Sequence, residues 1–377
     1  PVEMQVQPGD THPLQVRLYN EKGAYLGTAK ELNKKIQFEV EGVGKVVDGE
    51  YIAPAKTVTD AALLTASLGD VTGTARVRVI PPFSWSYDFD NGEIPVTWVG
   101  IRYRHIPIDF ELLQALKAQN PMASELYIFL MSSFINSGLP AAKYDDSTPR
   151  KGWTDFTTFM KMSEVAGDLQ QSKAKIDPLL EILKDKGVVK GWSWENWNNG
   201  SLKGIRLTVQ RGPRKISEGN GVMMKITTIP KGMRSQGWMG TIDAHDYTIE
   251  ADIYASEKDG RLPDIGLVGQ RYTLDLMGAS QQLQIRTWTP QLRMAQTVPY
   301  EWKPRVWYRL KFRTEAQDGK AVLKGKVWER GKPEPAEWTV TAEDPSPNLT
   351  GSPGTYGNAK DAELFYDNIK VYENSDG

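Results

Sequence analysis

Alternation of apolar and polar residues between Tyr247 and Met294 constrains the fold more than any other feature of this 377-residue chain. Apolar side chains occupy every second position at its start, namely Tyr247, Ile249, Ala251 and Ile253. The alternation continues over residues 272–276 and 282–286, and Gly, Pro and Asp divide the stretch into strand-length pieces. A period of two with one apolar face is typical of half-buried antiparallel strands. The stretch therefore predicts strands with one face in a core and one polar face.

The polar face of this stretch supplies the candidate ligand-binding residues, which are Arg271, Asp275, Gln282, Gln284, Arg286 and Trp288. If the strands lie side by side, these groups converge on one surface. Amide, carboxylate and guanidinium groups suit sugar hydroxyls, and a flat indole suits the C–H face of a sugar ring. We therefore predict a glycan-binding face. A salt-bridged polar face and a surface that docks another domain are the alternatives.

The balance of charges and the lack of cysteine exclude several classes of function. The chain has 46 Lys and Arg against 47 Asp and Glu, so it lacks the basic field that attracts nucleic acid. The absence of Cys excludes disulfides, thiol nucleophiles and thiolate zinc sites. No apolar run reaches the ~18–20 residues that a membrane-spanning helix needs. We predict no nucleic-acid partner and no membrane span.

Three segments with different patterns divide the chain. Residues 1–82 contain short strand-length pieces between turn signals, which predicts a small β-sandwich. Residues 107–187 change to helical spacing and predict an α-helical insertion. Residues 83–106 and 188–377 contain strand patterns joined by short turns, which predicts a second sandwich of two sheets. The expected helices of the insertion cover residues 108–119, 121–136, 153–169 and 177–187.

Two phrases resemble known β-sandwich families. GEYIAPAKTVTDAALLTASLGDVTGTARVRVIPP resembles bacterial Ig-like modules. FSWSYDFDNGEIPVTW and AELFYDNIKVYE resemble the first and last strands of concanavalin- or laminin-G-like jelly rolls, which pair with each other. The resemblance implies a mainly β chain, in which an Ig-like β-sandwich precedes a jelly roll that carries the helical insertion.

Longer phrases resemble one group more closely. KITTIPKGMRSQGWMG, LPDIGLVGQRYTLDLMG and QLQIRTWTPQLRMAQTVPYEWKPRVWYRLKF are similar to the C-terminal region of exported bacterial proteins with quinoprotein-type β-propeller repeats. The resemblance implies a periplasmic or extracellular location and a β-propeller of the parent protein as a partner. No propeller repeats are visible in the chain, so we expect no quinone cofactor in it. Pro1 in place of an initiator Met suggests either a trimmed chain or a part of a larger exported protein.

Glu250 and Asp252 are the candidate catalytic pair. They lie two residues apart and therefore on one face of a strand. Retaining glycosidases use two carboxyl groups ~5–5.5 Å apart, and one family of jelly-roll glycosidases uses the pattern E-x-D-x-x-E. Ala255 occupies the position of the second Glu, and this departure weighs against the mechanism. A jelly-roll glycoside hydrolase or lyase is therefore the alternative function, and pairing of the two acids with cross-strand Arg or Lys is the structural alternative.

Oxygen-bearing residues near both ends of the predicted jelly roll form a candidate calcium site, namely Asp88, Asp90, Asn91, Asp367 and Asn368. Pairing of the first and last strands would bring them together, and calcium takes ~6–8 oxygen ligands. Turn residues that bind their own backbone are the alternative.

Trp192, Trp194 and Trp197 follow the insertion at strand spacing. They are expected either to pack the insertion against the sandwich or to form an aromatic platform. Taken together, these features predict a non-catalytic module of an exported bacterial protein that binds a glycan or a partner domain on a polar sheet face. A purely structural component is a further alternative.

Overall fold

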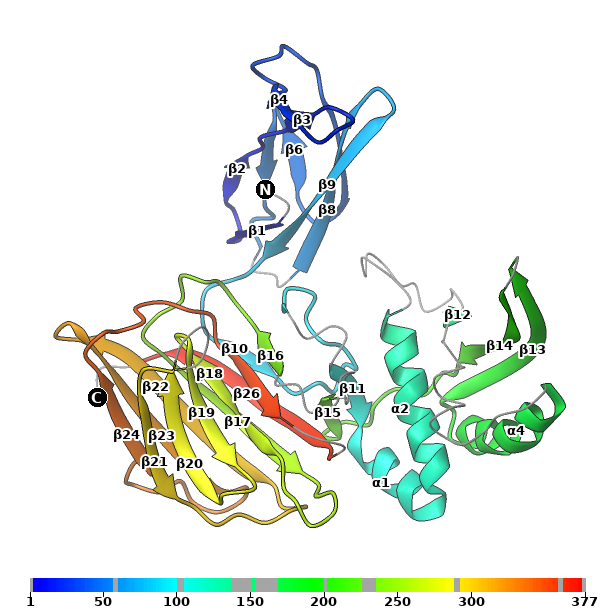
Figure 1. The fold of residues 1–377 in the computed structure, drawn as a ribbon, viewed down its shortest axis with the longest axis vertical. Coiled ribbons are helices and arrows are strands. Elements are labelled where there is room, and N and C mark those ends of the chain that lie inside the picture. The colour runs from blue at the N-terminus through cyan, green and yellow to red at the C-terminus, as the bar shows by residue number, and fades with distance from the viewer. Residues whose placement is uncertain are drawn as a thin grey trace.

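The computed structural model shows a three-lobed chain, with the N-terminal lobe at the top of Figure 1, a large β-sandwich at lower left and an α/β insertion at right. It describes residues 3–56, 60–99, 105–136, 151–152, 169–199, 202–225, 235–287, 292–358 and 362–374. None of the described helices is both long and apolar enough to cross a bilayer.

The N-terminal lobe contains two facing sheets and a separate hairpin. One sheet has the order β1 (Glu3–Val6), β9 (Val71–Val79), β8 (Asp60–Leu68) and β5 (Gln37–Gly42). The other has the order β2 (Thr11–Pro13), β7 (Glu50–Ile52) and β6 (Lys45–Val47), and the hairpin is β3 (Arg17–Tyr19) with β4 (Tyr25–Thr28). Tyr51 and Val77 lie fully buried in the core that the two sheets share. This lobe is the predicted small β-sandwich, and its Ig-like character stays a prediction.

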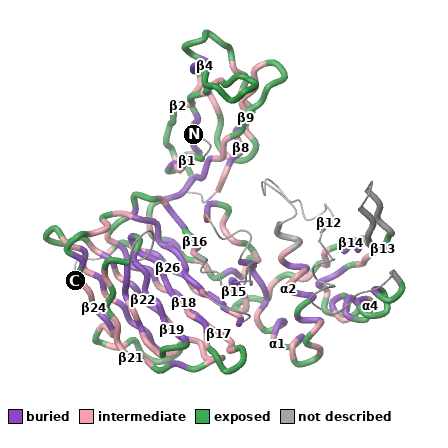
Figure 2. Tube along the Cα trace, in the orientation of Figure 1, coloured by how far each residue is buried: buried purple, intermediate pink, exposed green. Residues whose placement is uncertain are grey.

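The main sandwich consists of a large sheet and a small sheet. The large sheet has the order β11 (His105–Asp109), β15 (Gly221–Lys225), β26 (Leu364–Glu373), β17 (Tyr247–Ala255), β22 (Tyr308–Gln317), β23 (Lys320–Glu329) and β24 (Val340–Asp344). The small sheet has the order β16 (Ser235–Trp238), β25 (Gly354–Asn358), β18 (Asp264–Gly269), β19 (Tyr272–Met277), β20 (Gln282–Thr287) and β21 (Ala295–Pro299). One hydrophobic core lies between the two sheets. Figure 2 shows that the strands on both sides of this core consist largely of buried residues.

The predicted pairing of the ends of the jelly roll is confirmed. Strand β10 (Trp85–Tyr87) pairs antiparallel with β26, and Trp85 lies opposite Val371. The core face of β17 is also confirmed, because Tyr247, Ile249 and Ala251 are fully buried between the sheets. The chain is thus mainly β, and its jelly-roll sandwich carries a helix-containing insertion.

The insertion is larger than predicted and is not purely helical. Its elements are α1 (Phe110–Gln119), α2 (Pro121–Asn136), β12 (Lys151–Gly152), α4 (Leu169–Asp185), β13 (Val189–Asn199) and β14 (Leu202–Arg211). The last two strands were expected in the jelly roll, but they form a separate sheet in the order β12-β14-β13. They share a second core with the helices. Strand β11 begins before the helices and belongs to the large sheet, so the expected boundaries at 107 and 187 differ from the observed ones.

Helix α4 begins earlier than the Asp-Pro signal at residues 177–178 predicted. The helix starts at Leu169 and contains Pro178 in its interior. Asp177 is therefore not an N-cap, and its carboxylate instead accepts hydrogen bonds from the indole N–H groups of Trp192 (2.8 Å) and Trp194 (2.7 Å). These two Trp residues thus hold the β13–β14 hairpin on α4. The side chain of Trp197 and the expected helix at 153–168 lie outside the described residues.

Candidate functional site

The outer face of the large sheet carries the polar residues of β17. Glu250 and Asp252 alternate with the core residues of this strand and point away from the small sheet. The candidate ligand residues of β19 and β20 belong to the small sheet. The ligand candidates of β19 and β20 do lie on neighbouring strands. Glu250 and Asp252 do not share their surface, because β17 belongs to the opposite sheet.

Asp252 is the centre of a charged network on the large sheet. Its carboxylate accepts two hydrogen bonds from the Arg309 guanidinium on β22, at 2.6 and 2.9 Å. Arg330 Nε lies 3.2 Å from the same carboxylate, and Asn368 Nδ2 donates to it at 2.9 Å. The residue is fully buried beneath these partners. Asp252 therefore acts as an anchor for two guanidinium groups and is not open to a substrate.

Glu250 is also paired. Its carboxylate lies 3.2 Å from Lys311 Nζ and accepts a hydrogen bond from the Tyr372 hydroxyl. Ala255, the position of the missing second acid, is fully buried in the core between the sheets. A Glu there would therefore point into the core. The contacts of all three positions favour the structural interpretation of the Glu250 and Asp252 pair over the hydrolase.

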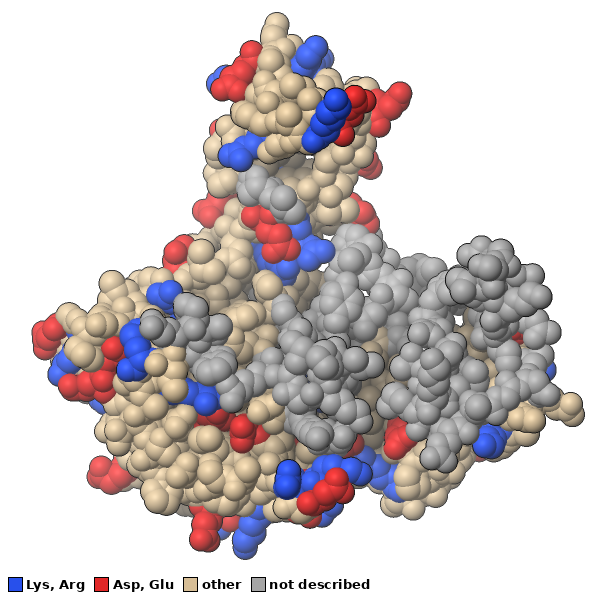
Figure 3. Space-filling view, viewed as in Figure 1, with Lys and Arg blue, Asp and Glu red and all other residues tan. Residues whose placement is uncertain are grey.

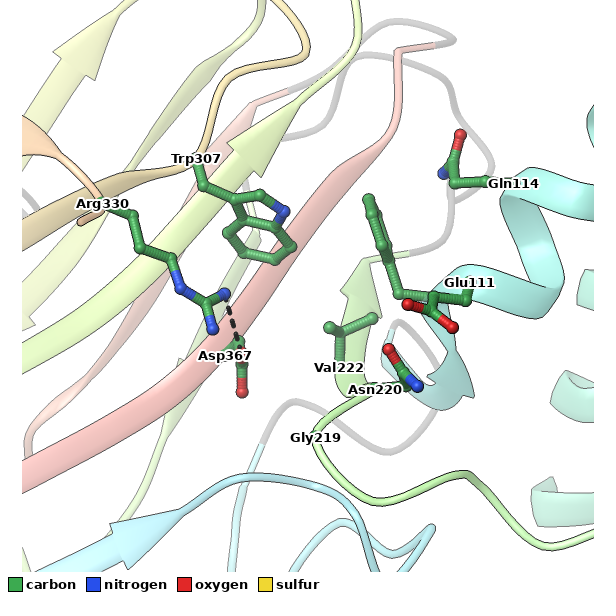
Figure 4. A pocket seen from close by; sticks show the side chains of 9 residues that line it. Glu111, Gln114, Gly219, Asn220, Val222, Trp307, Arg330 and Asp367 are labelled. Atoms are coloured by element: carbon green, nitrogen blue, oxygen red, sulfur yellow. Dashed lines mark hydrogen bonds and ion pairs between the residues drawn. The ribbon is translucent and has the colours of Figure 1, made fainter.

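A hollow of about 350 Å³ lies where the insertion meets the outer face of the large sheet (Figure 4). Its lining residues come from both lobes and are Phe110, Glu111, Gln114, Gly219, Asn220, Val222, Trp307, Arg330 and Asp367. Two aromatic side chains line it together with two amides, two carboxylates and a guanidinium. It is the larger of the two hollows described here; the other, beside Asp109 and Arg214, holds only about 20 Å³.

Packing fixes the aromatic wall of the hollow. The rings of Phe110 on α1 and Trp307 before β22 lie 5.4 Å apart, and both rings contact Tyr254 at 5.2 Å. The Arg330 guanidinium lies 5.3 Å from the Trp307 ring, within the range of a cation–π contact. The wall is therefore held by contacts from β17, β22 and α1 before any ligand binds.

Asp367 and Arg330 form the charged part of the hollow on the sandwich side. Arg330 Nη1 lies 3.2 Å from Asp367 Oδ2, as drawn in Figure 4. Burial raises the pKa of the Asp367 carboxyl to about 6; the Asp252 and Asp90 carboxylates add to this effect, and the Arg330 guanidinium opposes it. The carboxyl therefore changes its charge close to neutral pH.

The insertion side of the hollow offers polar groups without protein partners. Gln114 Nε2 is buried and has no hydrogen-bond partner within the described part of the chain. The side chains of Glu111 and Asn220 enter no hydrogen bond or ion pair with any described residue. A buried donor without a partner costs ~1–3 kcal/mol. The side chains of Glu111 and Asn220, which also line the hollow, are consequently available to a bound molecule.

The small-sheet residues predicted to bind a ligand are mostly engaged with one another. Asp275 is fully buried and lies 2.5 Å from Arg286 Nη2, and Arg286 also donates to the Tyr356 hydroxyl at 3.0 Å. Gln284 Nε2 donates to Thr297 Oγ1 at 2.8 Å. The observed pairing agrees with the structural alternative, a salt-bridged polar face.

The three other predicted ligand residues do not complete an open site there. Gln282 lies at the start of β20 and is half-buried. Arg271 lies in the turn before β19, where its Nε donates to the Thr350 carbonyl at 3.2 Å. Trp288 lies outside the described residues.

The candidate calcium ligands are dispersed among other partners. Both Asp90 oxygens accept backbone N–H groups, from Gly219 and Gly221, each at 2.7 Å. Asp88 accepts the backbone N–H of Asp90, and Asn91 accepts that of Glu93. Among the described residues, no three His, Cys, Asp or Glu side chains lie close enough to share a metal ion. In this arrangement the described candidate residues do not form a calcium-binding site. Structural calcium stays a prediction.

Asp367 and Asn368, the calcium candidates on the last strand, belong to the Asp252 network instead. Asn368 Nδ2 donates to both Asp252 Oδ2 and Asp367 Oδ2, each at 2.9 Å. Asp367 therefore enters the candidate site as a wall of the hollow.

Sequence reasoning missed Trp307, Arg309 and Arg330. The alternation used for β17 could have found the first two, because Tyr308, Leu310 and Phe312 are buried in the core and their neighbours must point outward. The contribution of Glu111, Gln114 and Asn220 depends on how the insertion docks on the sheet, and no local pattern encodes this.

Comparisons with known proteins give a fold likeness only. No protein-family model matches the chain, and no curated protein matches it. Among solved structures, Caenorhabditis elegans galectin LEC-6 is 10% identical and has a TM-score of 0.27, with 42% of this chain and 99% of that chain covered. A Bacillus subtilis protein of unknown function with a galectin-like fold is 12% identical, with a TM-score of 0.30 and coverages of 49% and 90%.

Lectin II from Ulex europaeus is similar to the same degree, at 8% identity and a TM-score of 0.28, with 48% of this chain and 92% of that chain covered. The TM-scores are too low to support any argument about function. The sandwich architecture of this chain is therefore established by its own strand pairing and core.

Proposed function

We propose that this chain is a non-catalytic binding module that holds a glycan in the hollow between the insertion and the large sheet. The observation that carries the proposal is the combination of an aromatic wall, formed by Phe110 and Trp307, with the unpaired polar side chains of Glu111 and Asn220 in the same hollow. The proposed site lies on the outer face of the large sheet and uses other residues than those predicted from the sequence, which belong to the small sheet.

The chemistry of the hollow suits a sugar. A sugar ring presents C–H groups that pack on aromatic carbon, and hydroxyl groups that both donate and accept hydrogen bonds. The two amides supply donors and acceptors, and the carboxylates supply acceptors. The volume of about 350 Å³ lies at the lower end of the ~300–1,000 Å³ range of small-molecule sites. We therefore expect the hollow to take the end of a glycan.

A location outside the cytoplasm and a β-propeller partner follow only from the sequence resemblance, and both stay proposals.

Figure 3 shows acidic and basic residues interspersed on the visible face of the described chain. A hydrolase that uses Glu250 and Asp252 receives no support, because Asp252 is fully buried and paired with two arginines.

A glycan array followed by calorimetric titration tests the proposal. We expect wild-type protein to bind a glycan and Trp307→Ala to weaken the affinity about 10-fold or more, because the variant removes the aromatic wall. Trp338→Ala is the matched control, since Trp338 contacts Lys326 on the large sheet and does not line the hollow.

A second variant separates the two sheet faces. Gln284→Ala alters the outer face of the small sheet and should leave the affinity unchanged. Loss of binding in Gln284→Ala with full binding in Trp307→Ala would place the site on the small sheet. An array without any bound glycan would refute the proposed function.

A further inference from the structure

We infer that the hollow discriminates by charge, so that it accepts neutral and amino sugars and rejects glycans that carry carboxylate or sulfate groups. This inference rests on the proposed function and names the ligand class of the same site. It follows from which charged groups of the hollow are already paired and which are not.

The guanidinium groups of Arg309 and Arg330 are already paired with carboxylates. Two nitrogens of the Arg330 guanidinium face Asp252 and Asp367, each at 3.2 Å, and the group also stacks on Trp307. The Arg309 guanidinium donates two hydrogen bonds to the Asp252 carboxylate. Recognition of an anionic sugar normally uses an open bidentate guanidinium. Here Nε and Nη1 of Arg330 and Nε and Nη2 of Arg309 already face carboxylates, so an incoming carboxylate would find fewer free donors.

The acidic groups outnumber these cations. Asp252 and Asp367 balance Arg309 and Arg330, which leaves Asp90 and Glu111 without cationic partners among the described residues. The Asp90 carboxylate accepts hydrogen bonds from the backbone N–H groups of Gly219 and Gly221, and Gly219 lines the hollow. The Asp90 carboxylate also contributes to the raised pKa of Asp367. Asp90 and Glu111 are therefore carboxylates that no described cation pairs with directly.

Glu111 is the unpaired carboxylate that a ligand in the hollow would meet. It lies in the first turn of α1 and lines the hollow opposite Arg330 and Asp367 (Figure 4). Its carboxylate can accept hydrogen bonds from a hydroxyl or an ammonium group, but it repels another carboxylate. Glu111 is thus expected to determine specificity, and Trp307 to contribute to affinity for every ligand.

Three β-1,4-linked trisaccharides that differ in their charged groups test this inference. Cellotriose is neutral, the β-1,4-linked glucosamine trimer carries ammonium groups and the β-1,4-linked glucuronate trimer carries carboxylates. They are titrated at low ionic strength into wild-type protein, Glu111→Gln and the control Glu125→Gln, whose Glu lies exposed on α2 away from the hollow. The same backbones are included on the glycan array together with longer neutral, amino and acidic glycans.

We expect affinity to fall in the order amino, neutral, acidic. Glu111→Gln should weaken amino-sugar binding about two- to five-fold, as loss of one exposed charge pair does, and leave the neutral sugar unchanged. Glu125→Gln should behave as wild type. The difference between amino and neutral sugars should shrink in 0.5 M NaCl, because salt screens exposed charges.

Acidic glycans that bind as tightly as their neutral counterparts would overturn the charge discrimination and leave the proposed function intact. The same conclusion follows if Glu111→Gln lowers the affinity for the amino sugar no more than Glu125→Gln does. If no trisaccharide and no array glycan binds at all, the proposed function itself fails, and the inference fails with it.

Discussion

Single residues in this chain owe their roles to the partners that surround them. Asp252 shows this most clearly, since a strand position that suggests catalysis holds a fully buried carboxylate with two arginine partners. The alternation of β17 predicted which way Asp252 points. It could not predict that Arg309 and Arg330, more than fifty residues away in sequence, would cover it.

Replacing Asp252 should strongly destabilise the protein. Asp252→Ala removes the common partner of Arg309 and Arg330 and leaves both guanidinium groups poorly paired. We expect the free energy of unfolding to fall by about 3 kcal/mol, measured by urea denaturation. Glu257→Ala is the control, because it breaks an exposed pair with Arg305 and should cost no more than about 1 kcal/mol. Equal losses in the two variants would contradict the anchoring role.

Replacing Gln114 should affect stability and binding in opposite directions. Gln114→Met removes a buried amide without a partner and keeps a side chain of similar size, so the free energy of unfolding should rise by about 1 kcal/mol. Glycan affinity should fall, because the polar end of a side chain that lines the hollow is lost. Urea denaturation and calorimetry measure the two effects. A variant that is clearly less stable would show that the amide has a partner in the folded protein.

The Asp367 carboxyl should make stability depend on pH. Its pKa is raised to about 6 in the folded protein, whereas an unfolded Asp titrates near ~3.9. Between these values the folded protein keeps a proton that the unfolded chain has released, so the contribution of Asp367 to the free energy of unfolding falls as pH rises. The difference between wild type and Asp367→Asn should therefore decrease from about pH 4 to pH 6 and then level off. A difference that increases over this window would contradict the raised pKa.

At the scale of elements, local patterns predicted individual strands better than their assembly. Helix α2 and the pairing of β10 with β26 agree with the sequence. The hairpin of β13 and β14 carries the same strand pattern as the jelly roll, yet it joins the insertion because its apolar residues pack on α4. A period of two indicates a strand with one apolar face, but several different surfaces can cover that face.

The two indole contacts of Asp177 should stabilise the hairpin specifically. Asp177→Ala leaves Trp192 and Trp194 without their acceptor. We expect faster hydrogen exchange in β13 and β14 and unchanged exchange in β17 and β22. Asp185→Ala, an exposed change at the end of the same helix, is the control. Unchanged exchange in the hairpin would show that apolar packing alone holds it.

At the scale of the whole molecule, the candidate site exists only because separate lobes meet. The insertion supplies Glu111 and Gln114, and the sandwich supplies Trp307, Arg330 and Asp367. Arg78 joins the N-terminal lobe to the sandwich in a similar way, since it is buried and donates to the carbonyls of Val96 and Trp98 at 3.0 and 3.1 Å. Such sites depend on docking between distant segments, so one sequence does not reveal them.

Hydrogen–deuterium exchange with and without the first-ranked glycan from the array tests the central claim most directly. The account predicts slower exchange in α1 and in residues 219–225 when the glycan is bound, because both segments line the hollow. It predicts no change in β19 and β20. Slower exchange confined to β19 and β20, with α1 unaffected, would contradict the account and return the binding site to the small sheet.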